Sequence, residues 1–210
     1  MTGLFLSFEG GEGLGKSVQA ARLAEDLRAH GRDVIATREP GGTAAGERIR
    51  ELLLHARDAA LSPETQALLF SAARAQLVRE VIGPALAAGR IVIADRFFDS
   101  TLAYQGYGYG ADLEGLRAMT RFVAGEVIPR RTFLLDAPVE VMLARVARRP
   151  GAWDRFHASD RSFYERVREG YLRLAAAEPA RFVIVDGVRS EEVIAADIRR
   201  QVDALFGAPA

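Results

Sequence analysis

Five short apolar runs alternate along the chain with longer segments in which apolar residues recur every three to four positions. The runs are rich in β-branched and aromatic residues, and they are apolar at successive positions, which is typical of buried parallel strands. They cover residues 4–8, 34–36, 91–94, 132–135 and 182–185. The periodic segments predict helices over residues 17–30, 45–54, 63–88, 113–126, 139–148, 160–177 and 191–206.

Local signals support several of these boundaries. Ser62-Pro63-Glu64 and Ser190-Glu191 are typical of helix starts, and Gly83-Pro84 predicts a break in the segment 63–88. The alternation of strands and helices predicts an α/β fold: a parallel five-stranded sheet with helices on both faces and right-handed crossovers. At 210 residues, the chain is expected to form a single domain, residues 1–210.

Composition excludes several classes of protein. The chain has 28 basic and 28 acidic residues, so bulk charge gives no reason to expect a nucleic acid or a membrane surface as partner. It has no cysteine, which rules out disulfides and thiolate metal sites. The start of the chain lacks the pattern of a signal peptide, and no apolar run reaches 18 residues. We therefore expect a cytoplasmic protein that acts on small molecules.

The chain contains a single lysine, Lys16, and the other 27 of its 28 lysine and arginine residues are arginines. Lys16 lies in an octet that fits the phosphate-binding pattern G-x-x-x-x-G-K-[ST], in which backbone N–H groups surround the phosphates of a nucleoside triphosphate such as ATP. A compact ammonium reaches the β- and γ-oxygens as a point charge. The expected nucleotide-binding residues are Gly10, Gly11, Glu12, Gly13, Leu14, Gly15, Lys16, Ser17 and Val18.

Polar residues follow the first four predicted strands. Glu9 and the octet follow the first, residues 38–43 the second, Asp95-Arg96-Phe97 the third and Asp136 the fourth. Ligands of such sheets bind at the carboxyl ends of the strands. The sequence therefore predicts one active site at this edge of the sheet.

A magnesium site is expected where the octet meets the third strand. The Ser17 hydroxyl opens the first helix, where it would coordinate Mg²⁺ beside the phosphates. Asp95 ends a strand and would hold the ion directly or through water, although an aspartate there could equally cap a turn. Glu9 could assist in the same shell.

Arg96 follows Asp95 at the position where many ATPase machines carry a glutamate that aligns water. An arginine there suggests that the task is to hold an anion. Transfer of a phosphoryl group to another phosphate brings two polyanions side by side, and their repulsion has to be offset by cations. Arg96 is well placed to bind the acceptor phosphate.

The densest basic stretch runs from Arg145 to Arg155. Arg145, Arg148 and Arg149 share one helix face, and Pro150-Gly151 then ends the helix. A flexible lid at about residues 145–158, with arginines that reach the transferred phosphate, would have this pattern. A solvated basic face would have it too.

Phe70 and Arg74 lie one helical turn apart. Such a pair can stack on a nucleobase and donate a hydrogen bond to a base carbonyl, although Phe70 could equally be a core residue.

Three longer motifs resemble those of thymidylate kinases. Residues 95–106 match the signature D-R-[YF]-x-x-S-x-x-A-Y-Q-G, residues 37–43 read T-R-E-P-G-G-T, and residues 68–74 match the base-binding helix of that family. The resemblance extends from about residue 4 to residue 186. It implies a P-loop nucleoside monophosphate kinase fold, ATP and Mg²⁺ as cofactors, and the reaction of ATP with dTMP to give ADP and dTDP.

The resemblance also implies a role for each matching residue. Phe70 would stack on thymine, and Arg74 would donate to the O4 carbonyl, where cytosine presents an amino group instead. Glu12 would bind the 3′-hydroxyl, and Tyr104 would crowd a 2′-hydroxyl. The pocket would be completed by Ser100 and Gln105 near the base or sugar and by Arg38 and Arg96 near the acceptor phosphate.

The lid arginines and the absence of an arginine from the phosphate loop resemble the bacterial subtype of the family. The catalytic cations would then be Lys16, Arg96, Arg149 and Arg155. Family members are typically homodimers. Apolar residues at Ile49, Leu52 and Leu53 could serve an interface, and core packing explains them equally well.

Alternative functions are less well supported. A GTPase would need an Asn-Lys-x-Asp motif, but the chain has no asparagine and one lysine. A remodelling ATPase would carry the acidic residue that Arg96 replaces, and a non-enzymatic nucleotide-binding module would not need the arginines. A kinase of another nucleotide or nucleoside shares the mechanism and remains open. Tyr109 also departs from the family, which commonly has arginine there.

Overall fold

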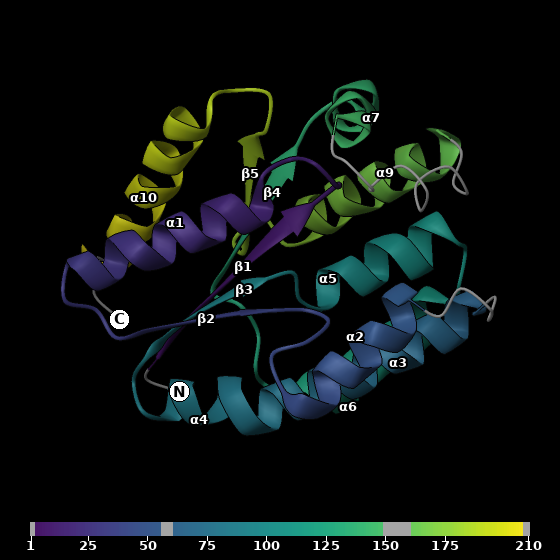
Figure 1. Cartoon of the computed structure of the whole chain (residues 1–210), viewed down its shortest axis with the longest axis horizontal. Helices are drawn as coiled ribbons and strands as arrows, with labels where there is room; N and C mark the ends of the chain where they lie inside the picture. The colour runs from purple at the N-terminus through teal and green to yellow at the C-terminus, as the bar shows by residue number, and fades with distance from the viewer. Residues whose placement is uncertain (1–2, 56–60, 149–160, 208–210) are drawn as a thin grey trace.

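A computed structural model describes residues 3–55, 61–148 and 161–207 of the chain (Figure 1). Its strands are β1 (Leu4–Gly10), β2 (Val34–Arg38), β3 (Ile91–Asp95), β4 (Arg131–Asp136) and β5 (Phe182–Asp186). Its α-helices are α1 (Lys16–Ala29), α2 (Ala44–His55), α3 (Pro63–Leu77), α4 (Gly83–Ala87), α5 (Phe98–Thr101), α6 (Leu113–Ala124), α7 (Val139–Ala147), α9 (Arg161–Ala177) and α10 (Glu191–Gly207). Two π-helical segments are η1 (Val78–Ile82) and η2 (Leu102–Gly108).

The five strands form one parallel sheet in the order β2-β3-β1-β4-β5, which confirms the predicted fold class. Each predicted strand is present and extends by one or two residues beyond its predicted bounds. Arg38 on β2 and Phe8 on β1 both pair with Asp95 at the end of β3. The carboxyl ends of these strands therefore meet at one edge of the sheet.

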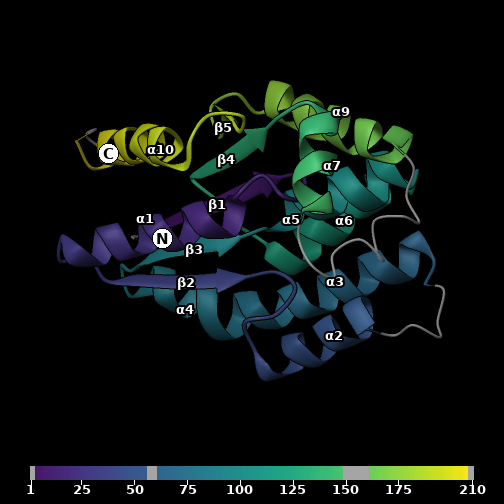
Figure 2. The same ribbon diagram turned by 45° about the horizontal axis from the view of Figure 1, so that its top comes forward.

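The central strand β1 is covered on both faces, because its residues from Phe5 to Gly10 are all buried. Its side chains alternate between the faces. Phe5 packs edge-on against Phe97, and Glu9 accepts a hydrogen bond from Tyr171, so this face lies under α5 and α9. The opposite side of the sheet carries α1, which also packs against α10 (Figure 2).

The predicted break at Gly83-Pro84 takes the form of a π-helical turn between α3 and α4. The Gly83 N–H donates to the Val78 carbonyl, five residues earlier. Pro84 then occupies the first turn of α4, where a missing N–H is tolerated. The helical path from Pro63 to Ala87 is therefore continuous.

The sequence prediction missed the helical character of α5 and η2. The segment is rich in glycine and tyrosine, which are poor helix formers. Tertiary packing overrides this propensity, since a Cβ atom at Gly108 would lie only 2.7 Å from the Phe163 ring on α9. The close approach of η2 to α9 depends on that glycine.

Candidate active site

One cavity of about 590 Å³ opens at the carboxyl edge of the sheet. It is lined by residues from the phosphate loop, the loop after β2, helix α3, the end of β3 and segment η2. Most of the predicted site residues line it: Glu12, Gly13, Gly15, Lys16, Ser17, Val18, Arg38, Phe70, Arg74, Asp95, Arg96, Ser100, Tyr104 and Gln105. Three residues of the loop border a second, much smaller cavity instead: Gly10, Gly11 and Leu14.

Glycine geometry shapes the phosphate loop. Gly15 has φ 89°, in the left-handed region that favours glycine, and α1 begins at the next residue. Among the described residues, no side chain caps this helix start and its first turn carries no acidic residue. The N–H groups of the first turn are thus left for an anion, which the helix dipole also favours.

The Lys16 ammonium folds back onto its own loop, where it donates to the Gly11 carbonyl at 2.6 Å. Burial, and then the positive charge of Arg96, lower the pKa of Lys16 to about 8. The negative charge of a bound polyphosphate would favour the protonated form of Lys16 and so counteract both causes.

Ser17 and Asp95 form the predicted metal-side pair. The Ser17 hydroxyl donates to Asp95 Oδ2 at 2.5 Å, and Oδ1 of the same carboxylate is buried without a hydrogen-bond partner among the described residues. Oxygen donors of this kind suit Mg²⁺. The described part of the chain holds no group of three acidic or histidine side chains placed to bind a metal ion, so the remaining ligands would have to be phosphate oxygens and water.

Glu9 makes its hydrogen bonds to other groups than this pair, and its assisting role in the metal shell stays a prediction. Its Oε1 accepts the Phe97 N–H at 2.8 Å, and its Oε2 accepts the hydroxyls of Ser100 at 2.6 Å and Tyr171 at 2.8 Å. Burial, and then the charge of Asp99, raise the pKa of Glu9 to about 7. Because both oxygens are taken by scaffold donors, Glu9 organises the segment after β3.

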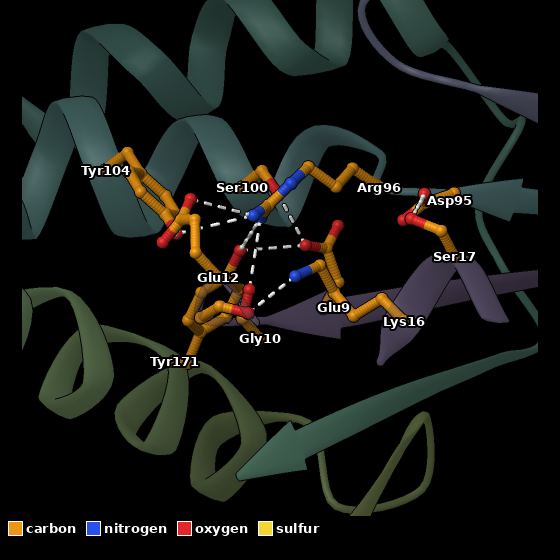
Figure 3. Close-up of polar contacts among 11 residues, drawn as sticks. Glu9, Gly10, Glu12, Lys16, Ser17, Asp95, Arg96, Ser100, Tyr104 and Tyr171 are labelled. Carbon is orange, nitrogen blue, oxygen red and sulfur yellow. Dashed lines mark hydrogen bonds and ion pairs between the residues drawn. The ribbon is translucent and has the colours of Figure 1, made fainter. Parts of the chain in front are cut away.

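Arg96 lies at the centre of a polar network between the phosphate loop and α9 (Figure 3). Its backbone has φ 70°, which is unusual for a residue other than glycine, and its N–H donates to the Phe8 carbonyl. Its guanidinium donates from Nη2 to Glu12 at 3.0 Å and lies over the ring of Tyr104. The Tyr104 hydroxyl also donates to Glu12, at 2.6 Å.

Arg74 occupies the base end of the cavity, held by a carboxylate that sequence reasoning did not assign. Its Nε and Nη2 donate to Glu39 at 2.7–3.1 Å, and Nη2 also donates to the Thr101 hydroxyl at 3.0 Å. Its Nη1 is buried and has no partner among the described residues. Glu39 thus fixes the guanidinium so that one donor remains for a ligand.

Two further predicted residues, Phe70 and Gln105, line the same cavity. Phe70 is half-buried and lines the cavity, so it is not a core residue. Gln105 donates from its amide nitrogen to Gln66 Oε1 at 3.2 Å, and Gln66 is anchored in turn by the Leu61 carbonyl. Gln66 lines the cavity too and was missed because nothing in its local sequence marks it.

Arg38 lies at the rim of the cavity. Its Nη2 donates to both oxygens of Glu47 at 2.9 and 3.0 Å, and about half of its side chain is exposed. It is therefore accessible to a phosphate that enters the cavity.

The lid arginines are described only in part. Arg145, on α7, donates to the carbonyls of Gly187 and Val188, which ties this helix to the loop after β5. Arg149 and Arg155 lie outside the described residues.

Comparisons with known proteins agree with this geometry. The family model described as thymidylate kinase matches residues 8–198. The thymidylate kinase of Pseudomonas syringae pv. tomato is 50% identical over 206 residues, which cover 98% of this chain and 96% of the relative. That of Pseudomonas fluorescens is 52% identical over 186 residues, which cover 89% and 88%. The crystal structure of thymidylate kinase from Ehrlichia chaffeensis superimposes with a TM-score of 0.79 at 32% identity, covering 97% of this chain and 99% of that one.

Proposed function

The chain belongs to the thymidylate kinase family, and we propose that it transfers the γ-phosphoryl group of ATP to dTMP, giving ADP and dTDP. The observation that carries this proposal is the shared cavity. Lys16 of the phosphate loop, Arg96 after β3 and the Phe70–Arg74 pair on α3 all line it. A nucleoside triphosphate and a pyrimidine monophosphate would therefore bind side by side.

The donor half of the cavity suits ATP. The N–H groups at the start of α1 and the Lys16 ammonium would hold the β- and γ-phosphates. Ser17 and Asp95 would hold Mg²⁺, which when bound neutralises charge on the phosphate oxygens. Asp95 Oδ1 supports this assignment, because this buried oxygen has no hydrogen-bond partner among the described residues and Mg²⁺ would give it one.

The acceptor half suits dTMP. Phe70 would stack on the thymine ring, and the free Nη1 of Arg74 would donate to its O4 carbonyl. Cytosine has an amino group at that position, so Arg74 would meet a second donor there and disfavour cytosine. Gln105 would line the base or sugar pocket. Glu12 and Tyr104, which contact each other, would line the sugar site and favour deoxyribose.

Arg96, with Arg38 at the rim and Ser100 beside it, would bind the acceptor phosphate. An ionised phosphate oxygen is already a nucleophile, so no general base is required. These residues would act by positioning the two phosphates and offsetting their repulsion. Arg149 and Arg155 would add positive charge to the transferred group from the lid.

We also propose that the protein is a homodimer. Exposed apolar side chains occur on neighbouring helices: Leu52 on α2, Leu68 on α3 and Phe122 on α6, with exposed fractions of 44%, 61% and 90%. Because Leu52 is exposed, the apolar stripe formed by Ile49, Leu52 and Leu53 is better explained by a subunit interface than by core packing. The measured molar mass in solution should be twice that of the chain. None of the helices in the described ranges is long and apolar enough to span a bilayer, and a cytoplasmic location stays a prediction.

The function is tested by purified protein, ATP, Mg²⁺ and a panel of nucleoside monophosphates, with ADP release as readout. We expect dTMP to be the preferred acceptor. A preference for another monophosphate would support the alternative, a kinase of a different nucleotide.

Lys16→Ala should remove most turnover, on the order of 10³-fold, and leave the fold intact, because within the described chain the Lys16 ammonium donates its hydrogen bond to its own loop. Lys16→Arg is the matched control, since it keeps the charge but widens the donor. Circular dichroism checks folding. Full activity of Lys16→Ala would contradict the phosphate-loop assignment.

A further inference from the structure

The Tyr171 hydroxyl, on α9, lies under the Arg96 guanidinium (Figure 3). Its ring is 2% exposed and packs edge-on against Tyr104. The hydroxyl contacts three side chains that come from β1 and the segment after β3: Glu9, Arg96 and Ser100. Nothing in the sequence around Tyr171 marks it as part of the site.

The directions of these hydrogen bonds follow from the donors available. A tyrosine or serine hydroxyl has one proton and two lone pairs. Tyr171 and Ser100 both direct their protons to Glu9 Oε2, at 2.8 and 2.6 Å. Each hydroxyl oxygen is then left as an acceptor, and Arg96 Nη1 donates to Tyr171 at 3.1 Å and to Ser100 at 3.0 Å.

The Gly10 carbonyl provides a third acceptor for Arg96 Nη1, at 3.2 Å. The scaffold thereby occupies one nitrogen of the guanidinium, Nη1. Nη2 donates to Glu12 at 3.0 Å and to the Tyr104 hydroxyl at 3.4 Å, both of which line the cavity, and within the described chain Nε has no hydrogen bond to protein. The edge formed by Nη2 and Nε is therefore the one that faces the cavity, where a bound phosphate would replace Glu12 as the acceptor of Nη2.

We propose that Tyr171 is a positioning residue for the acceptor phosphate, which it serves by holding Arg96 Nη1 so that the Nη2–Nε edge of the guanidinium faces the cavity. The inference deepens the proposed function, because it assigns a residue on α9 to the same site. A planar guanidinium binds phosphate well only in a fixed orientation. The Gly10 carbonyl and Ser100 remain as acceptors of Nη1, so removing the Tyr171 hydroxyl loosens the guanidinium rather than freeing it, at a cost of about tenfold in affinity.

Tyr171→Phe removes the hydroxyl and keeps the buried ring. We expect affinity for dTMP, measured by calorimetry, to fall about tenfold, and affinity for thymidine, which lacks the phosphate, to stay the same. The KM for ATP should not change. Tyr107→Phe is the matched control: Tyr107 packs against Gly170, beside Tyr171, and takes no part in the network around Arg96. That variant should behave like the native protein.

A double-mutant cycle with Arg96→Lys tests whether Tyr171 acts through Arg96. In the Arg96→Lys background, Tyr171→Phe should cause no further loss of dTMP affinity. Equal losses for dTMP and thymidine, an undiminished loss in the Arg96→Lys background, or native affinity of Tyr171→Phe would each overturn the proposal. The binding measurements decide the role of Tyr171 without turnover, whereas failure of the native protein to phosphorylate dTMP would overturn the proposed function alone.

Discussion

Two arginines in this molecule are buried against carboxylates in nearly the same way, but one of them has a guanidinium nitrogen without a hydrogen-bond partner among the described residues. Arg74 pairs with Glu39 and Arg181 pairs with Asp99, each through two nitrogens. Every nitrogen of Arg181 has a partner, because Glu178 and Thr132 complete its set. Arg74 leaves Nη1 unpaired within the described chain and lines the cavity.

The difference separates a structural ion pair from a recognition site. A buried donor without a partner costs about 1–3 kcal/mol. Around Arg181 the protein satisfies every donor and gains a fixed contact between α5 and the start of β5. At Arg74 the unpaired Nη1 lowers the stability of the ligand-free protein, and a hydrogen bond to a ligand carbonyl would offset that loss. The unpaired atom, rather than the ion pair, identifies the binding residue.

Breaking the structural pair should have the largest effect. Asp99→Asn removes the buried carboxylate of Arg181 and leaves only the half-exposed Glu178 to balance its charge, so the free energy of unfolding should fall by about 3–5 kcal/mol. Urea denaturation measures it. Asp203→Asn, which breaks an exposed pair with Arg199, is the control and should change stability by less than about 1 kcal/mol. Similar losses in both variants would refute the special role of burial.

Glu9 extends the comparison to a third buried carboxylate. Unlike Glu39 and Asp99, it has no ion pair within 4 Å among the described residues. Its pKa rises from 4.5 to about 7, chiefly through burial. Between these values the folded state binds more protons than the unfolded chain, so stability falls as pH rises. The loss should approach roughly 3 kcal/mol between pH 5 and 8. Glu9→Gln should lose this slope in urea denaturation, and an unchanged slope would assign the effect to other groups.

In substrate discrimination, changing the recognition arginine should have the smallest effect in free energy and the most specific one, and the loss of the buried partner of Glu39 adds a separate cost in stability. Arg74→Gln should lower the ratio of kcat/KM for dTMP over dCMP, by roughly tenfold, because the donor to O4 is lost. Arg79→Gln, at an exposed position on the same helical path, is the control. Denaturation curves show whether the variant is folded at the assay temperature. A preserved ratio in folded Arg74→Gln would contradict contact with O4.

The sheet could be predicted from sequence because its signal is local. Each strand is a short apolar run, and the parallel order places the residues that follow the strands at one edge. The helical segment 98–108 could not be predicted, because packing of Gly108 against Phe163, far along the chain, overrides weak helix propensity.

The candidate site divides in the same way. Lys16, Ser17 and Asp95 were identified from short motifs, and they line the cavity as expected. Glu39 and Tyr171 were not identified, since their partners Arg74 and Glu9 lie 35 and 162 residues away. Glu9 was predicted beside the metal site, and its hydrogen bonds to donors from α5 and α9 show a structural role that its local sequence did not indicate.

The sequence by itself determined the strand and helix pattern, the phosphate loop and the chemical types at the site, because these depend on backbone geometry and spacing within a few residues. Only the tertiary structure decided which hydrogen-bonding atoms are occupied by the scaffold and which are left for a ligand. Burial makes that distinction matter, since a donor or acceptor removed from water must find a partner, and the identity of the partner depends on contacts between distant segments.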